Sequence, residues 1–146
     1  MTINQIQDEI ITEFSAFEDW MDKYEYLIEL GKNLETFDEQ YRTNQNLIDG
    51  CQSQVWLNAE FIDGKLHFTA DSDAIITKGI VSLLIRIFTN QNPDNILNTN
   101  LYFIEKTGLQ QHLSPTRSNG LMSMVKQMRL YAMAYKNYKG QSNSGC

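Results

Sequence analysis

The fold is decided by the stretch QVWLNAEFIDGKLHFTADSD, residues 54–73. Apolar and polar side chains alternate along it on both sides of Asp63-Gly64, a dipeptide typical of two-residue hairpin turns. The apolar positions share one face of the two expected strands: Val55, Leu57, Ala59, Phe61, Leu66, Phe68 and Ala70. The stretch therefore predicts an antiparallel β-hairpin with one buried face.

Two amphipathic helices are expected before the hairpin. Apolar residues recur at spacings of three and four over residues 3–17 and again over residues 20–30. Gly31 follows the second pattern at the position of a helix C-cap glycine. Residues 32–49 are polar with few helix signals, so we expect a long connecting loop with at most a short helical turn.

After the hairpin, Ser72 or Asp73 is expected to cap a helix from Ala74 to about Asn90. This segment is apolar on almost every side, which predicts the buried helix of the fold. Residues 101–104 (LYFI) fit either a short strand or a helical turn.

The C-terminal part predicts a loop over residues 114–120 and a last helix capped by Ser118 or Asn119 and ending near Tyr138. Residues 139–146 are rich in Gly, Ser and Asn, which predicts a flexible tail. Residues 1–138 would then form one domain.

The order helix, helix, hairpin, helix, helix predicts an α+β protein with a small antiparallel sheet covered by helices. The 146 residues are 42% hydrophobic and 21% charged, which suits one globular domain. No run approaches the ~18 apolar residues of a membrane span. The first residues lack the pattern of a secretory signal, so we expect a cytoplasmic protein with no membrane partner.

Charge is distributed unevenly along the chain. Residues 1–63 hold fourteen acidic and three basic residues, whereas residues 106–146 hold six basic residues and no acid. Either an acidic helical layer faces a basic helix within the fold, or the charge forms a docking surface for a protein partner. The net charge of −6 argues against nucleic acid as a partner.

Cys51 is the candidate reactive residue. It lies at the end of a polar loop next to Gly50, just before the alternating strand, whereas packing cysteines usually lie within an apolar pattern. A buried inert thiol is the alternative. Arg117, beside an expected helix start, would favour an anion such as a thiolate, or would simply be a surface ion-pair partner.

Three segments together resemble the SufE family, the cysteine-desulfurase sulfur acceptors of iron–sulfur cluster assembly. They are YLIELG at residues 26–31, NLIDGCQSQVW at residues 46–56 and HLSPTRSNGL at residues 112–121. The similarity covers about residues 5–136. One departure, Glu35-Thr36 where family members often carry proline, affects the expected loop geometry and not the chemistry.

The resemblance implies a SufE/IscU-like fold with a three-stranded antiparallel sheet against helices. It implies that Cys51 accepts sulfur as a persulfide and that Arg117 assists. The partners would be a cysteine desulfurase of the SufS or CsdA type and a downstream cluster-assembly scaffold. Pyridoxal phosphate would reside on the desulfurase, and this chain would carry no cofactor and no metal.

Three other functions compete with this interpretation. An iron–sulfur scaffold needs about three converging thiolates, and this chain has only Cys51 and Cys146. A cysteine hydrolase needs a positioned histidine base, and His67 and His112 both look structural. A binding module without chemistry would tolerate loss of Cys51. For a Cys51 persulfide, apolar cover is expected from Trp56, Phe61 and Leu121.

Overall fold

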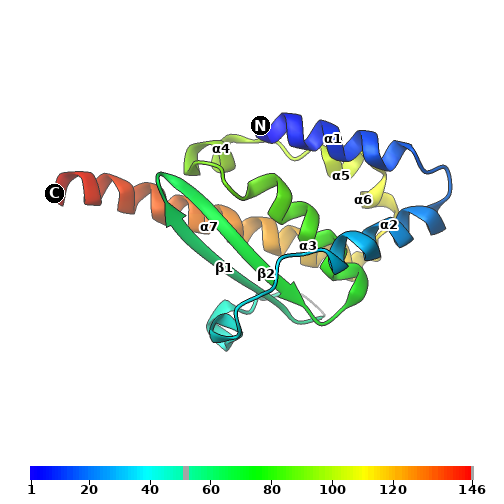
Figure 1. The fold of residues 1–146 in the computed structure, drawn as a ribbon, viewed down its shortest axis with the longest axis horizontal. Coiled ribbons are helices and arrows are strands. Elements are labelled where there is room, and N and C mark those ends of the chain that lie inside the picture. Colours follow the sequence, from blue (N-terminus) through cyan, green and yellow to red (C-terminus); the bar gives the residue numbers. More distant parts are fainter. Residues whose placement is uncertain (51–52, 146) are drawn as a thin grey trace.

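The computed structural model of the chain describes residues 1–50 and 53–145, with side chains placed up to residue 136. Its hairpin forms as predicted (Figure 1), with β1 (Val55–Ile62) antiparallel to β2 (Lys65–Ser72). Asp63 and Gly64 both have positive φ, 53° and 78°, which is the backbone of a type I′ turn that matches the twist of the strands.

The predicted third strand is wrong for the described part of the chain, whose one sheet has two strands. In its place Leu47 makes a single bridge to Trp56, and the Ile48 N–H donates to the Val55 carbonyl at 2.9 Å. The 3₁₀ helix η2 (Asn44–Asn46) ends just before this bridge, and Gly50 turns the chain away just after it. The extended segment between them is too short for a ladder.

α3 (Ile75–Phe88) is the buried helix, as predicted, and it packs on β2. Its expected side-chain cap is wrong, because the N-cap position is Ala74. Ser72 Oγ accepts from the Ala74 N–H at 3.2 Å, whereas Asp73 Oδ1 accepts from the Gln54 N–H at 3.0 Å. Asp73 therefore fastens the start of β1 to the start of α3.

α1 (Ile3–Ser15) and α2 (Trp20–Lys32) confirm the two N-terminal amphipathic helices. The connection after α2 contains only the short 3₁₀ helices η1 (Glu39–Tyr41) and η2. Gly31 is not a C-cap, because it lies buried inside α2 where this helix crosses α3. A Cβ on Gly31 would lie 2.9 Å from the Gly79 nitrogen, so glycine is needed for the two backbones to approach.

An ion-pair network joins α1 to α3. Arg86 on α3 donates to Glu13 at 2.6 and 2.9 Å and to Glu9 at 3.0 Å, and the Tyr26 hydroxyl also donates to Glu13. The hydrogen bond from Arg86 is the largest cause that lowers the pKa of Glu13. Burial, followed by the bond to Glu13, raises the pKa of Tyr26 to about 12.

The lowered pKa of Glu13 predicts acid sensitivity. An unfolded glutamate has a pKa of about 4.3, so the stabilisation is complete above that pH and is lost as the pH falls through the lower folded value. The Glu13→Gln variant should therefore lose less stability than the wild type between pH 6 and pH 3, by urea midpoints at about six pH values. Glu9→Gln is the control, because Glu9 is the more exposed partner of Arg86. The stability of this variant should change with pH more nearly as that of the wild type does.

The C-terminal part is helical throughout most of its length. After α3 come α4 (Pro93–Asn98), α5 (Phe103–Lys106) and α6 (Leu109–His112), so the ambiguous residues 101–104 contribute a helical turn. The long α7 (Pro115–Gly145) follows and runs past the hairpin (Figure 1). Its apolar stripe has five buried residues and the half-buried Tyr131 and Tyr135; the buried ones are Leu121, Met124, Val125, Met128 and Ala132.

α7 begins earlier than predicted. The expected loop over residues 114–120 is wrong, because Pro115 opens the helix and the Ser114 Oγ accepts from the Arg117 N–H at 3.3 Å. Proline suits the first helical position, since its missing N–H would have no partner there. The backbone of α7 continues through residues 139–145, and flexibility of this tail stays a prediction.

Candidate functional site

Cys51 lies in the sequence between Ile48 and Val55, two residues that are joined by a backbone hydrogen bond. Cys51 and Gln52 lie outside the described residues, but both of their flanks are described. The Ile48 N–H bond to the Val55 carbonyl joins the two ends of the loop. The predicted position of the Cys51 sulfur, turned partly inward, therefore stays a prediction, while the surroundings of the loop can be given residue by residue.

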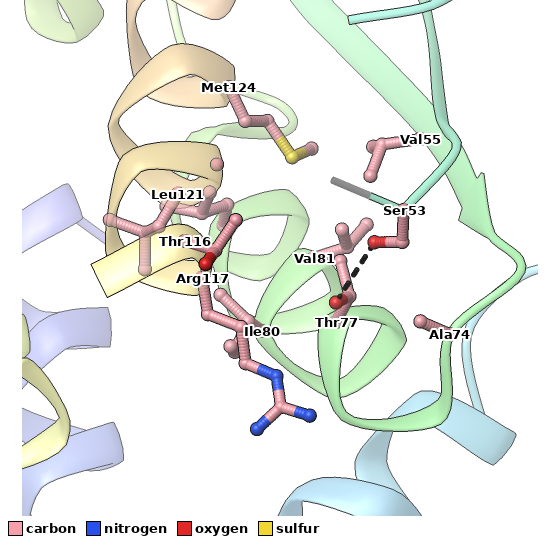
Figure 2. Close-up of a pocket in the computed structure, with 12 residues that line it drawn as sticks. Ser53, Val55, Ala74, Thr77, Ile80, Val81, Thr116, Arg117, Leu121 and Met124 are labelled. Atoms are coloured by element: carbon pink, nitrogen blue, oxygen red, sulfur yellow. Dashed lines mark hydrogen bonds between the residues drawn. The ribbon is translucent and has the colours of Figure 1, made fainter. Parts of the chain in front are cut away.

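The downstream flank is attached to the start of α3. Ser53 Oγ donates to Thr77 Oγ1 at 3.3 Å, which Figure 2 shows as a dashed line. The Gln54 N–H donates to Asp73 Oδ1 at 3.0 Å, and the Asp73 N–H donates back to the Gln54 carbonyl at 3.2 Å. Three hydrogen bonds thus fix the backbone directly after Gln52.

The upstream flank passes against α7. Gly50 has φ +89°, which residues with a Cβ rarely adopt, and a Cβ built there would lie 2.6 Å from Ser123 Oγ. Gly50 therefore both turns the chain and lets it touch α7. The two flanks thus contact different helices, since Ser53 bonds to α3 whereas Gly50 lies against α7.

A cavity of about 230 Å³ opens at this place, between α3, the start of β1 and the first turns of α7. Its inner walls are apolar, from Val55, Ile80, Val81, Leu84, Leu121 and Met124. Figure 2 shows Met124 from α7 pointing toward Val55 across it. The polar part of the lining comes from Ser53, Thr77, Thr116 and Arg117.

Arg117 lies in the first turn of α7 and lines the same cavity as Ser53. Its side chain is exposed, and its guanidinium extends away from the apolar walls in Figure 2. The hydrogen bonds and ion pairs of the described residues include none from this guanidinium. A cation without a fixed carboxylate among the described residues, in the first turn of a helix, favours an anion at this place.

The expected apolar cover is partly wrong. Leu121 lines the cavity, but Phe61 stacks on Tyr135 at 5.3 Å between ring centroids, and Trp56 lies under the Arg42 guanidinium at 4.7 Å. Sequence reasoning missed Thr77 and Met124 as lining residues. Thr77 is a polar side chain in a largely apolar helix, which was an available signal, whereas Met124 looked like an ordinary core position.

The two histidines lie elsewhere in the structure. His67 is on β2 opposite Glu60, and His112 stacks on Trp20 with ring centroids 3.7 Å apart. Neither is among the described residues that line the cavity. In the described ranges, no three side chains of the kinds that ligate metal ions come together. Within the same ranges, none of the helices has the length and apolar character that a bilayer crossing requires.

Two known proteins are similar to this chain in sequence. An uncharacterized SufE-like protein of Rhizobium meliloti (strain 1021) is 40% identical over 127 residues, which are 84% of this chain and 91% of that protein. SufE-like protein 1, chloroplastic/mitochondrial, of Arabidopsis thaliana is 39% identical over 137 residues. The match covers 93% of this chain but only 37% of the plant protein.

A solved structure has the same fold. The solution structure of a hypothetical protein from Thermus thermophilus superposes with a TM-score of 0.73 at 16% sequence identity, and the match covers 88% of this chain and 94% of that one. The family model described as SufE, Fe-S metabolism associated domain, matches residues 8–132, a range that contains the hairpin, the Cys51 loop and the cavity. With this match over most of its length, the chain belongs to the SufE family.

Proposed function

We propose that this protein accepts sulfane sulfur from a cysteine desulfurase as a persulfide on Cys51 and passes it on for iron–sulfur cluster assembly. The observation that carries the proposal is the cavity between α3 and α7, which is lined by Ser53, two residues after Cys51, and by Arg117. Membership of a family associated with Fe–S metabolism supports the same direction.

The transfer is a thiol–persulfide exchange. The Cys51 thiolate attacks the outer sulfur of the desulfurase persulfide, a new S–S bond forms on Cys51, the old S–S bond breaks, and the desulfurase cysteine leaves as a thiolate. No net oxidation occurs, because one persulfide is consumed and one is produced. The pyridoxal phosphate that releases sulfur from free cysteine belongs to the desulfurase, of the SufS or CsdA type, and this chain needs no cofactor.

The cavity suits the product of this reaction. A water molecule in the liquid occupies about 30 Å³, so about 230 Å³ leaves room for the added sulfur beside the loop. The apolar walls disfavour water and dissolved reductants, while Arg117 and the start of α7 favour a thiolate or persulfide anion at the mouth. Shelter and charge together would keep the persulfide intact until a downstream scaffold protein receives the sulfur.

The test is peptide-resolved mass spectrometry after incubation with a SufS-type desulfurase and free cysteine. We expect an addition of about 32 Da, one sulfur atom, on the peptide that contains Cys51. Mass addition that requires iron, or bound iron in the purified protein, would instead favour a cluster scaffold. Turnover of an ester substrate with a burst phase would favour a cysteine hydrolase.

Arg117 is expected to assist the transfer without stabilising the fold. Arg117→Ala should lower the rate of sulfur uptake by about tenfold, because a nearby cation favours the thiolate form of a cysteine and the anionic persulfide. The melting temperature should change little, because the side chain is exposed. Lys126→Ala removes another exposed cation of α7, outside the lining of the cavity, and is the matched control. Equal uptake by the two variants would remove Arg117 from the mechanism.

A further inference from the structure

Arg42 makes the most elaborate side-chain contact of the connection between α2 and β1. Its guanidinium donates two hydrogen bonds to Glu39, at 2.9 and 3.0 Å, and a third to Asp71 Oδ2 at 2.9 Å. It also lies over two aromatic rings, 4.7 Å from the centroid of Trp56 and 5.3 Å from that of Phe37. Only 27% of the side chain is exposed, so these contacts are partly shielded from solvent.

The binding site for Arg42 spans both strands of the hairpin. Trp56 on β1 and Asp71 on β2 are cross-strand partners, so one residue of the pair supplies a ring and the other a carboxylate. Asp71 is itself held by Lys78 at 3.3 Å and by the Ser72 N–H at 2.8 Å. A planar guanidinium can stack on a ring and pair with a carboxylate at the same time, which lysine cannot do.

Arg42 adds a side-chain anchor to the segment upstream of Cys51. Among the described side chains of residues 38–50, only that of Arg42 hydrogen-bonds to a residue outside this segment. The backbone adds the bridge between Leu47 and Trp56 and the bond from Ile48 to Val55. Figure 1 shows the segment, in cyan, below the hairpin, and η1 and η2 both contact β1.

The two flanks of Cys51 are therefore fixed by different means. Downstream, Ser53 and Gln54 are hydrogen-bonded to residues of the α3 start. Upstream, the backbone pairs with β1 at Leu47 and Ile48, the Ile48 side chain is buried in the core and Gly50 lies against α7. Arg42 holds the start of this segment against the hairpin. Loss of the Arg42 contact would loosen the start of the upstream segment, while the bonds of the downstream flank stayed in place.

We propose that Arg42 is a positioning residue for Cys51, which holds the upstream flank of the loop against the Trp56–Asp71 pair so that the thiol faces its partner in a fixed direction. The proposal rests on the proposed function, since a fixed direction matters only if Cys51 exchanges sulfur. Exchange needs one sulfur to approach the other nearly in line with the breaking bond, and orientation supplies much of such a rate.

The test measures Cys51 in two independent ways. Alkylation by iodoacetamide, resolved on the Cys51 peptide, reports how accessible the thiol is without any partner. Sulfur uptake from a desulfurase reports productive orientation. Arg42→Ala should raise the alkylation rate and lower sulfur uptake by about tenfold, since misplacement of reacting groups by ~1 Å can cost up to about a hundredfold. Arg42→Lys should recover part of both effects.

Arg86→Ala is the matched control, because Arg86 also pairs with two carboxylates and is 33% exposed but lies in the α1–α3 network. It should lower the melting temperature and leave both Cys51 readings at the wild-type value. If Arg42→Ala does not fold, Asp71→Asn breaks the same contact from the other side and should shift both readings in the same direction.

Unchanged alkylation in Arg42→Ala and Asp71→Asn, or the same change in Arg86→Ala, would overturn the proposal. This failure differs from failure of the proposed function. If the wild type took up no sulfur, alkylation would still show whether Arg42 holds the loop. If the wild type took up sulfur but Arg42→Ala and the wild type were alkylated at the same rate, the proposed role of Arg42 would be wrong and the proposed function would stand.

Discussion

Cys51→Ser protein is expected to take up no sulfur from a desulfurase, which is the largest effect on activity that we foresee. Serine has nearly the shape of cysteine, but its hydroxyl does not ionise near neutral pH and cannot form a persulfide. Any stimulation of the desulfurase that depends on sulfur removal should be lost with it. The measurement is mass spectrometry of the Cys51 peptide together with sulfide release by the desulfurase under reducing conditions. The circular dichroism spectrum should match that of the wild type.

Cys146→Ser is the control for this result, since it removes the other cysteine of the chain. Cys146 lies outside the described residues and follows a segment rich in Gly, Ser and Asn. We expect normal sulfur uptake and fewer disulfide-linked dimers on a non-reducing gel. Wild-type uptake by Cys51→Ser, with loss of uptake in Cys146→Ser, would reverse the assignment and end the central proposal.

Gly79→Ala is expected to lower the free energy of unfolding more than alanine at any other described glycine, because its added methyl group has the closest contact. A Cβ at position 79 would lie 2.3 Å from the Leu27 carbonyl oxygen and 2.8 Å from its carbon, both backbone atoms of α2. Alanine in a helix normally gains about 1 kcal/mol over glycine. Here α2 must move off α3, and overpacking of this kind costs about 3 kcal/mol or more, a large part of a typical stability of ~5–15 kcal/mol.

The measurement is the urea midpoint and slope at pH 7, with Gly64→Ala as the control. Gly64 has φ +78° in the hairpin turn, so alanine there is strained by about 1–2 kcal/mol without forcing two helices apart. We expect a clearly smaller loss of stability for Gly64→Ala. If the two variants unfold at the same urea concentration, the contact between α2 and α3 is softer than its geometry indicates.

The elements with strong local signals were predictable. Strict alternation around Asp63-Gly64 specified the hairpin, and the apolar run from residue 75 specified the buried helix. The start of α7 was missed although Ser114-Pro115 carries a standard signal, a capping side chain before proline at the first helical position. The tight loop at residues 114–120 was expected because Ser, Asn and Gly are also common in turns.

Other features depend on partners far away in the sequence. Gly31 looked like a helix end because nothing local shows that Gly79 would lie against it. The contact of Arg42 with the hairpin was not predictable, since Glu39 is a local partner but Asp71 is 29 positions away. At the candidate site, Cys51 and Arg117 were singled out from the sequence, while Thr77 and Met124 required the packing of α3 on α7.

Two strands are too few to persist alone in water, because a single hairpin is at best marginally stable. In this molecule β2 therefore depends on α3 for its survival, and α3 depends on α2 through the glycine crossing. The walls of the cavity are formed by residues of β1, α3 and α7. Local opening of one wall would thus open the whole cavity, so the shelter that we propose for a persulfide would form and be lost together with the native fold, as one cooperative unit.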